Sequence, residues 1–293
     1  MGLKAVIPVA GLGTRMLPAS KEQPKEMLPI FDKGVKNVIV KPFVQRVFEE
    51  LYKAGFRDFY FIVGRGKRSI EDHFSVDEAF ISQLLSKGKG ALVEDLSSFY
   101  SMVLDSRITW INQHKPLGFG HAVLQVELAI GDSDTLLVHA GDTLVLDDEG
   151  REHPLIRELI KLHEELRPDA LLIVKKVPNP QIYGVVTLGK NVKSHVYQVD
   201  NIVEKPKVPI SNIASMAIYS FSKEIFNALK KTPFSAKGEL ELTDAIRLLI
   251  NEGRKVLAFL VPEEYVRIDI GTPENYWEAL KTTYRIALRM IRK

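Results

Sequence analysis

The first half of the chain alternates short apolar runs with stretches of helical periodicity. The apolar runs predict buried strands at residues 3–9, 58–63, 107–112, 135–140 and 170–177. Between them, apolar residues recur every three or four positions and predict helices at residues 42–54, 67–74, 76–85, from His121 onward and 154–166. Strands that alternate with helices in this way indicate β/α units and a mostly parallel sheet.

The second half of the chain follows a different pattern. Stretches rich in β-branched and aromatic residues lie at residues 183–188, 195–203 and 214–221, with polar turns between them. Two further apolar runs, at residues 255–261 and 265–270, also predict strands. Because short turns favour neighbouring antiparallel strands, we expect an antiparallel lobe to be added to the sheet late in the chain.

Capping residues and periodicity predict two helices in this half. Residues 243–250 form the first, with Thr243 as the expected N-cap. The last helix is expected to begin with Thr272 as its cap and Pro273 at its first position, where a missing N–H costs nothing. The apolar stripe of this last helix is expected to comprise Trp277, Leu280, Tyr284, Leu288 and Ile291.

No linker, repeat or low-complexity tract interrupts the 293-residue sequence, whose 45% hydrophobic and 26% charged residues are ordinary globular values. We therefore expect a single domain over residues 1–293. Its fold class is α/β, with a Rossmann-like, mixed and mostly parallel sheet flanked by helices and the late antiparallel lobe added to it.

The charge balance and the composition exclude several classes of partner. A net charge of +3, from 40 basic and 37 acidic side chains, is too balanced for general binding to nucleic acid or a membrane surface. No apolar run approaches the roughly 20 residues that cross a bilayer, and the N-terminal apolar stretch is too short for a signal peptide. The absence of cysteine fits a reducing compartment, so we expect a cytoplasmic protein. The histidines are scattered, and His153 and His163 are expected to be solvated.

The most unusual segment is GLGTRMLPASKEQPKEMLP at residues 11–29, directly after the first predicted strand. A dinucleotide fingerprint is a poor match, because Met16 stands where a third glycine is required. A P-loop does not fit either, because Gly13 is followed by threonine and arginine and not by lysine and a hydroxyl residue. A solvated surface loop is the third alternative, and the letters GLG alone do not argue against it.

The chemistry of this loop favours an anion site. Glycines allow backbone N–H groups to approach an anion closely, Thr14 adds a hydroxyl, and Arg15 adds a planar guanidinium suited to phosphate. Pro24 fixes the chain just before Lys25, a rigidity that a solvated lysine does not need. The loop also follows the carboxyl end of a strand, where ligands bind in open α/β sheets. The pattern therefore predicts a triphosphate cradle.

The segment AVIPVAGLGTRMLPASKEQPKEMLPI resembles the signature of the sugar-1-phosphate nucleotidyltransferase family, and in particular its bacterial uridylyl branch. Further matches follow in order along nearly the whole chain: KRSIEDHF, QHKPLGFGHAVL, GDTLV, IVEKPK, GELELTDAI and DIG. Two segments depart from the family pattern. Residues 34–40 form a short insertion, GVKNVIV, and residues 215–219 read differently at a place expected near the sugar. Both departures bear on the choice of sugar more than on the reaction.

The resemblance implies transfer of a uridylyl group from UTP to glucose 1-phosphate, giving UDP-glucose and pyrophosphate. Because the attacking group is already a phosphate anion, the reaction needs charge neutralisation and alignment and no general base. By the same resemblance, Arg15 holds the β- and γ-phosphates and Lys25 bridges toward the α-phosphate. The residues expected to cradle the nucleotide are Ala10, Gly11, Leu12, Gly13 and Thr14.

Two aspartates are candidates for binding a metal ion. Asp142 follows the predicted strand TLLVHA, and Asp269 lies at the end of the strand YVRIDI. Local sequence alone favours a turn cap for each of them. Together they match the family's pair of metal aspartates, and the resemblance implies Mg²⁺, which binds few carboxylates and accepts phosphate oxygens as further ligands.

The remaining expected contacts also come from the resemblance. Glu204 is expected to accept hydrogen bonds from sugar hydroxyls, and Lys205 to contact the sugar phosphate, although a solvated Glu-Lys pair is common at strand ends. Tyr183 is expected to pack on the sugar, with the backbone of Gly184 exposed to it. The expected readers of the base are Gln113, whose amide is both donor and acceptor, and Gly118.

Several alternatives remain open at this point. A sister enzyme that uses dTTP or another sugar 1-phosphate is the nearest, because uracil and thymine share one pairing edge. A non-catalytic nucleotide-sugar sensor is expected to have lost Arg15, Lys25, Asp142 or Asp269, and all of them are present. A bifunctional acetyltransferase is disfavoured, because no hexapeptide repeat is found. A homo-oligomer, dimer or tetramer, is possible, and its interface is not readable from the sequence.

Overall fold

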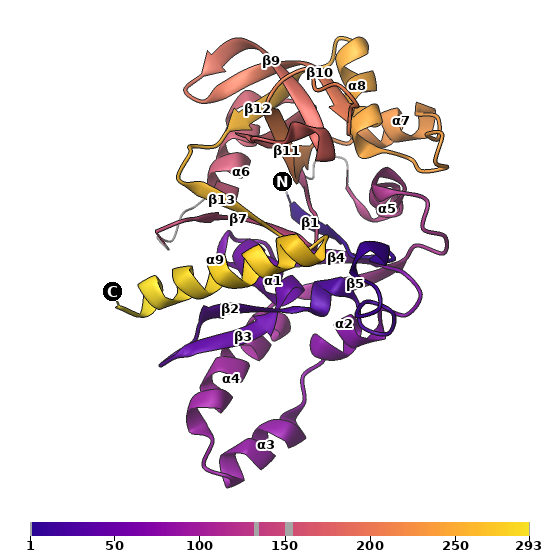
Figure 1. Cartoon of the computed structure of the whole chain (residues 1–293). Helices are drawn as coiled ribbons and strands as arrows, with labels where there is room; N and C mark the ends of the chain where they lie inside the picture. The colour runs from indigo at the N-terminus through magenta and orange to yellow at the C-terminus, as the bar shows by residue number, and fades with distance from the viewer. Residues whose placement is uncertain (1, 132–134, 150–154, 293) are drawn as a thin grey trace.

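The computed structural model describes residues 2–131, 135–149 and 155–292. A nine-stranded sheet forms the centre of this part of the chain (Figure 1). Its strands are β1 (Leu3–Pro8), β4 (Asp58–Val63), β5 (Arg107–Asn112), β6 (Thr135–His139), β8 (Ala170–Lys176), β9 (Gly184–Lys193), β10 (Val196–Glu204), β11 (Ile213–Phe221) and β12 (Val256–Leu260). Their order across the sheet is β5-β4-β1-β6-β11-β8-β12-β10-β9.

The direction of the strands confirms the expected fold class. β1 pairs in parallel with β4 and β6, β4 with β5, and β12 with β8. β11 runs antiparallel between β6 and β8, and β10 runs antiparallel between β12 and β9. Seven of these nine strands therefore point the same way and only β10 and β11 are reversed, so the sheet is mixed and mostly parallel in strand direction. The antiparallel strands include β11 at the centre of the sheet as well as the late addition at its edge.

Helices cover both faces of the sheet. Side chains of β1 alternate between the faces, because successive residues of a strand point to opposite sides. Ala5 and Ile7 pack in one apolar cluster with the helices α1 (Phe43–Lys53) and α6 (Leu155–Leu166). Val6 packs in the other, with α5 (Phe119–Leu124), α7 (Glu224–Lys231) and α8 (Leu242–Asn251). The remaining helices of three residues or more are α2 (Arg68–His73), α3 (Glu78–Ser86), α4 (Gly90–Leu104), α9 (Pro273–Arg292) and the 3₁₀ turns η1 (Thr14–Met16), η2 (Lys25–Met27), η3 (Glu127–Ala129) and η4 (Pro180–Ile182).

Two small sheets of two strands each lie beside the nine-stranded sheet. β7 (Thr143–Asp147) pairs antiparallel with β13 (Tyr265–Asp269), and β2 (Pro29–Lys33) pairs antiparallel with β3 (Val38–Pro42). The insertion predicted from the family pattern forms the tip of the β2–β3 hairpin and part of β3. Helix α9 crosses the molecule and lies on β2 and β13 (Figure 1). Among the described residues, no helix combines the length and apolarity needed to cross a membrane.

Most predicted elements are confirmed within a few residues, but the helices α4 and α7 and the strands β2, β3 and β7 were not predicted. The helix predicted at residues 154–166 is found as α6, but Pro154 and His153 lie outside the described residues. His163 is not solvated. It is 4% exposed, its Nδ1 lies 2.9 Å from Ser220 Oγ, and burial lowers its pKa to about 4.

The predicted stripe of α9 is wrong. Trp277 and Tyr284 are 59% and 45% exposed, and the side chains that α9 buries are Ala279, Thr283, Ile286 and Ala287. Three of these four residues are small, which suits a close approach to β2 and β13, and none of the five residues of the predicted stripe is buried. Of the two predicted N-caps, the one of α9 is confirmed and the one of α8 is wrong. Thr272 Oγ1 accepts from Asn275 N at 3.2 Å, as expected, but Glu241 and not Thr243 occupies the N-cap position of α8.

Candidate active site

The signature loop after β1 is held in place by its own glycine turn. Gly13 has φ of +65°, a left-handed conformation that favours glycine, and its carbonyl accepts from Ser20 Oγ at 2.8 Å. Gly11 has open space on its Cα side, so a ligand can approach the backbone there. Leu12, Thr14 and Arg15 are exposed, whereas Ala10 is buried at the end of the strand. The loop thus presents backbone and a guanidinium to solvent on a fixed base.

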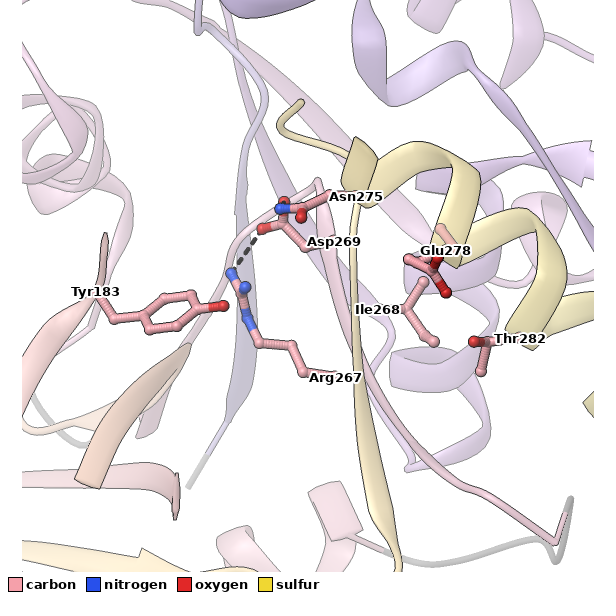
Figure 2. A pocket seen from close by; sticks show the side chains of 8 residues that line it. Tyr183, Arg267, Ile268, Asp269, Asn275, Glu278 and Thr282 are labelled. Atoms are coloured by element: carbon pink, nitrogen blue, oxygen red, sulfur yellow. Dashed lines mark hydrogen bonds and ion pairs between the residues drawn. The ribbon is translucent and has the colours of Figure 1, made fainter. Parts of the chain in front are cut away.

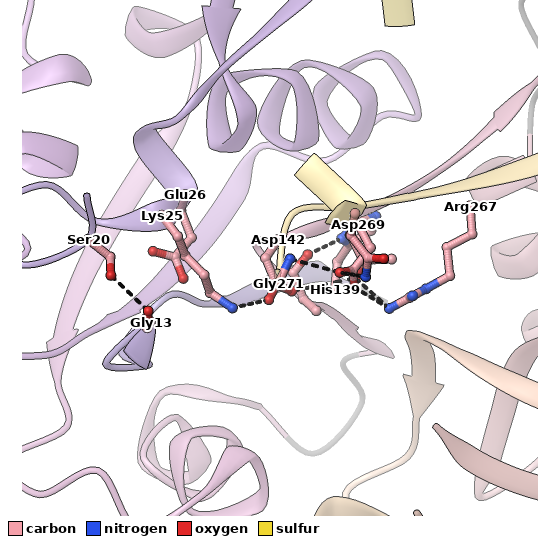
Figure 3. Close-up of polar contacts among 12 residues, drawn as sticks. Gly13, Ser20, Lys25, Glu26, His139, Asp142, Arg267, Asp269 and Gly271 are labelled. Atoms are coloured by element: carbon pink, nitrogen blue, oxygen red, sulfur yellow. Dashed lines mark hydrogen bonds and ion pairs between the residues drawn. The ribbon is translucent and has the colours of Figure 1, made fainter. Parts of the chain in front are cut away.

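Lys25 leaves this loop and reaches Asp142 directly after β6. Its ammonium donates to Asp142 Oδ2 (Figure 3). The side chains are 12% and 24% exposed, respectively, so the pair is largely removed from water. Burial by itself raises the pKa of Asp142, but Lys25 outweighs it and lowers the pKa to about 2. For the Lys25 pKa, burial acts downward and the attraction of Asp142 and Glu26 outweighs it, so the pKa is raised. Both groups are charged at neutral pH.

Asp269 is brought beside Asp142 by the pairing of two strands. Thr143 in β7 faces Asp269 in β13, and Ile270 N lies 3.4 Å from the carbonyl of Asp142. Asp269 Oδ1 accepts from Gly271 N at 2.8 Å and from the Asn275 amide at 2.9 Å. Asp269 therefore does cap the turn that follows β13. These hydrogen bonds also fix the orientation of its carboxylate.

Arg15 belongs to the same cluster. A Cβ placed on Gly271 would lie 3.1 Å from the guanidinium nitrogen Nη2 of Arg15 and 2.9 Å from Asp269 Oδ1. Gly271 is thus a point of close approach between the signature loop and the end of β13. The predicted catalytic residues Arg15, Lys25, Asp142 and Asp269, which are up to 254 positions apart in the chain (269 − 15), lie in one cluster.

The predicted sugar residues lie together where β9 meets β10. Gly184 pairs with Glu204 across these strands, and Lys205 N donates to the carbonyl of Tyr183 at 2.9 Å. Lys205 Nζ lies 2.7 Å from Glu204 Oε1, while Thr243 Oγ1 donates to Glu204 Oε2 at 3.2 Å. Thr243 therefore orients the glutamate instead of capping its own helix.

The expectation that Gly184 exposes its backbone needs correction. Gly184 is buried, and a Cβ on it would meet the methyl of Thr243 at 2.9 Å and Glu204 Oε2 at 3.3 Å. The missing side chain therefore allows Glu204 and Thr243 to approach β9. Residues 215–219, expected near the sugar, contain an irregularity in β11: Ala217 has φ of +55°, and its carbonyl accepts from Ala140 N at 3.0 Å.

Gln113 and Gly118 occupy the two ends of one tight turn. Gln113 is 6% exposed, and its Nε2 donates to the carbonyl of Gly118 at 3.1 Å and lies 2.9 Å from His121 Nδ1. Gly118 has φ of +100°, and a Cβ there would lie 2.8 Å from the carbonyl of Leu240. The amide nitrogen of Gln113 is thus used to hold the turn, which leaves its carbonyl oxygen as the group able to meet a base.

A pocket of about 110 Å³ opens beside Asp269 (Figure 2). Helix α9, strand β13 and Tyr183 form its walls, and most of its lining is polar. The lining residues are Tyr183, Arg267, Ile268, Asp269, Asn275, Glu278, Ala279 and Thr282. The pocket thus lies between Asp269, an expected metal ligand, and Tyr183, an expected contact of the sugar.

Two interactions of this cluster were not anticipated from the sequence. Arg267 donates to Asp269 Oδ2 at 2.6 Å, and Glu26, directly after Lys25, forms an ion pair of 3.0 Å with Lys67. Glu26 and Lys67 are 2% and 7% exposed. The alternation in VRID, which places Arg267 and Asp269 on one strand face, was an available signal for the first. No local pattern indicates the second, because its partners are 41 residues apart.

The donor set of the cluster fits a magnesium ion. Among the described residues, no group of three or more histidine, cysteine, aspartate or glutamate side chains is placed to bind a metal. Asp142 and Asp269 are two carboxylates on neighbouring backbone segments. Mg²⁺ is typically held by one or two carboxylates together with substrate phosphates and water, so a pair without further protein ligands suits it.

Comparison with known proteins agrees with this geometry. The model of a family described as nucleotidyl transferase matches residues 4–285. A UTP–glucose-1-phosphate uridylyltransferase of Bacillus subtilis is 37% identical over 290 residues, which cover 98% of this chain and 91% of the relative. A putative UTP–glucose-1-phosphate uridylyltransferase of Methanocaldococcus jannaschii is 36% identical over 253 residues, covering 85% and 82%.

Solved structures show the same similarity. A UDP-glucose pyrophosphorylase complexed with UDP-glucose has a TM-score of 0.81 and 30% identity, covering 97% of this chain and 99% of that one. A UTP-bound enzyme of the same name from Acinetobacter baumannii has a TM-score of 0.80 and 29% identity, covering 100% and 98%. Sequence, fold and the cluster of loop cations and aspartates thus agree, and the chain belongs to the nucleotidyl transferase family.

Proposed function

We propose that this protein transfers a uridylyl group from UTP to glucose 1-phosphate, releasing pyrophosphate and forming UDP-glucose. The observation that carries the proposal is the contact of Lys25, from the glycine-rich loop, with Asp142, beside Asp269. This arrangement places a cation of a phosphate-binding loop against a pair of carboxylates. The two relatives described above carry the name UTP–glucose-1-phosphate uridylyltransferase, one of them as putative, and these names support the choice of substrates.

The loop residues supply alignment and charge. The open backbone at Gly11 and the turn at Gly13 would receive the triphosphate, together with the hydroxyl of Thr14. Arg15 would bind the β- and γ-phosphates in a bidentate manner, and Lys25 would neutralise charge that builds up at the α-phosphate. Because Lys25 and its surroundings are largely dry, each unit of charge there acts more strongly than it would in water.

Asp142 and Asp269 would hold the Mg²⁺ ion. When bound, this ion would neutralise phosphate oxygens and stabilise charge on the departing pyrophosphate. The contribution of the chain is to keep both carboxylates charged and fixed. Lys25 does so for Asp142, while Gly271, Asn275 and Arg267 donate to Asp269.

The sugar would lie against the open end of the β9–β10 hairpin, where Gly184 begins β9 and Glu204 ends β10. Glu204 is oriented by Thr243 and would accept from sugar hydroxyls, while Lys205 would contact the sugar phosphate. The Lys205 side chain is 52% exposed, so it lies at the surface of the site. Its backbone has φ of +39°, and its N–H donates to the carbonyl of Tyr183. Tyr183 would form one wall of the sugar site, and Gly184 would allow Glu204 to approach.

The base would be read by the carbonyl oxygen of Gln113. Since Nε2 donates to Gly118, the orientation of the amide is fixed and Oε1 is an acceptor. Uracil N3–H is a donor that suits this acceptor, whereas N3 of cytosine is itself an acceptor. Thymine has the same N3–H, so this contact alone does not distinguish UTP from dTTP.

The experiment that tests the proposal is pyrophosphate release across UTP, dTTP, CTP, ATP and GTP, each with glucose 1-phosphate, galactose 1-phosphate or N-acetylglucosamine 1-phosphate. We expect the highest kcat/KM for UTP with glucose 1-phosphate, and a loss of release in the Asp142→Asn variant. A higher kcat/KM for dTTP or for another sugar phosphate would replace the proposed substrates. Binding of nucleotides without release under any combination would identify a sensor and overturn the proposal.

A further inference from the structure

Arg267 lies between Asp269, the expected metal ligand, and Tyr183, the expected wall of the sugar site. It shares a face of β13 with Asp269, because side chains two positions apart in a strand point the same way. Its Nη2 donates to Asp269 Oδ2 at 2.6 Å and to Thr143 Oγ1 at 3.3 Å. Its guanidinium carbon lies 4.5 Å from the centre of the Tyr183 ring (Figure 2). One cation thus contacts an expected metal ligand and an expected wall of the sugar site.

The arginine is mostly withdrawn from water and only partly satisfied. The side chains of Arg267 and Asp269 are 14% and 17% exposed. Arg267 Nε is buried and has no hydrogen-bond partner among the described residues. Burying two charges costs desolvation energy, and well-packed apolar side chains in their place are often as stable or more stable. The arrangement is therefore poorly explained by stability alone.

The contacts of Asp269 show what Arg267 adds. Gly271 N and the Asn275 amide both donate to Oδ1, so they fix one oxygen of the carboxylate. Arg267 donates to the other oxygen, Oδ2, which restrains rotation about the carboxylate axis (Figure 3). Its planar guanidinium also stacks on an aromatic ring, a contact that the point charge of lysine reproduces poorly. Arg267 therefore fixes two groups that lie on different elements of the fold.

We propose that Arg267 is a positioning residue that holds Asp269 and Tyr183 in one rigid unit, so that the metal ligand and the sugar are aligned together. The proposal rests on the proposed uridylyl transfer to a sugar phosphate. It assigns to Arg267 no contact with the reacting atoms. A displacement of about 1 Å in such a support can lower turnover by on the order of a hundredfold, because the reacting groups must meet in a narrow range of geometry.

The test compares two variants of Arg267 with two controls. Arg267→Met keeps the aliphatic stem and removes the charge, while Arg267→Lys keeps the charge and removes the planar group. Asn275→Ala removes a donor to Asp269 without a contact to Tyr183. Arg285→Lys is the matched control, because Arg285 pairs with Asp148 elsewhere on α9. Circular dichroism and thermal melting establish which variants are folded.

The decisive readout is binding without turnover. Dissociation constants for UDP and UDP-glucose are measured by calorimetry in EDTA, and their ratio gives the preference for the glucosyl group. We expect Arg267→Met and Arg267→Lys each to reduce this preference about tenfold, while Asn275→Ala and Arg285→Lys leave it within about twofold. We also expect Arg267→Met to lower kcat on the order of 10- to 100-fold. A Tyr183→Leu change in the Arg267→Met background should reduce the preference no further, because both act through one contact.

Two results would overturn the positioning role. One is an unchanged preference for UDP-glucose in both variants of Arg267, and an equal loss of affinity for UDP and UDP-glucose behind it would show direct binding of phosphate. The other is a lowered melting temperature with normal kcat, which is the behaviour of a structural ion pair. Since the wild type is assayed for pyrophosphate release in parallel, failure of the proposed reaction is recognised separately.

Discussion

The buried ion pair of Glu26 and Lys67 predicts a large and pH-dependent loss of stability when one partner is removed. Glu26 lies in η2 directly after Lys25, and Lys67 immediately precedes α2. Their charged atoms are 3.0 Å apart, and the side chains are 3% and 8% exposed. Lys67→Met preserves the length of the side chain but leaves Glu26 as a buried charge without this partner.

The expected loss of unfolding free energy in Lys67→Met is about 3–5 kcal/mol, the usual cost of leaving one member of a buried pair uncompensated. For a chain of this length, about 1 kcal/mol corresponds to a shift of roughly 1.5–2 °C in the melting midpoint, so the midpoint should fall by about 5–10 °C. The double variant Glu26→Gln/Lys67→Met should recover most of this loss, because neither side chain is then charged. Lys231→Met is the matched control. It breaks an exposed pair with Glu252 and should cost less than about 1 kcal/mol.

The pH dependence follows from the carboxyl group of Glu26. Burial raises its pKa in the folded protein, and Lys67 opposes this rise only in part. In Lys67→Met that opposition is lost, so the folded-state pKa of Glu26 rises further above its unfolded value. The cost of the substitution is then fully present above the folded-state pKa and decreases as the pH falls through it, because the folded state takes up a proton.

Thermal or urea unfolding of the variants and the wild type between pH 5 and pH 8 measures both effects. The loss should be largest at pH 8 and smaller at pH 5. A loss below about 1 kcal/mol at pH 8, or a loss that increases toward pH 5, would refute the argument, because it would mean that Glu26 is not a buried charge supported by Lys67.

The remaining predictions concern the reaction. Lys25→Ala should lower kcat on the order of 10²–10³-fold, the usual effect of removing one donor to developing charge, and near wild-type turnover at saturating substrates would contradict the assigned role. Asp142→Asn and Asp269→Asn should each remove most activity, and the double variant should lose little more, since the two are proposed to share one ion. If one of these variants kept its normal dependence on Mg²⁺, that aspartate would serve only its turn. Gln113→Ala should reduce the preference for UTP over CTP in kcat/KM about ten- to a hundredfold, with Mg²⁺ dependence unchanged. An unchanged UTP/CTP ratio with a lower melting temperature would show that Gln113 only holds its turn, a role that its contact with Gly118 makes a real competitor.

Local sequence was sufficient for the conformation of the first loop. The chemical features of residues 11–29 are glycines, prolines and three cations, and each acts through its own backbone or side chain. The predicted loop is found with Gly13 at positive φ and with Lys25 in a short 3₁₀ turn after Pro24. The strands predicted from apolar runs are also found, because burial on both faces leaves a continuous signal in the sequence.

The sequence was a weaker guide to which side chain pairs with which. Thr243 was expected to cap its helix and instead orients Glu204, and Gly184 was expected to expose its backbone and is buried. In both cases the residue that decides the contact belongs to another helix or strand: Glu204 of β10 for Thr243, and Thr243 of α8 for Gly184. The error on α9 has a related cause: large apolar residues suggested the buried face, whereas packing on β2 and β13 buries three small residues together with Ile286.

By itself, the sequence determined the order of most elements, the glycines, prolines and cations of the first loop and the presence of aspartates after two strands. These properties depend on residues near one another in the chain, so periodicity and turn chemistry reveal them. The tertiary structure alone decided that β11 enters the centre of the sheet, that β7 and β13 bring Asp142 beside Asp269, and that Arg267 reaches Tyr183. These contacts join segments far apart in the sequence, and only the packing of the fold brings them together.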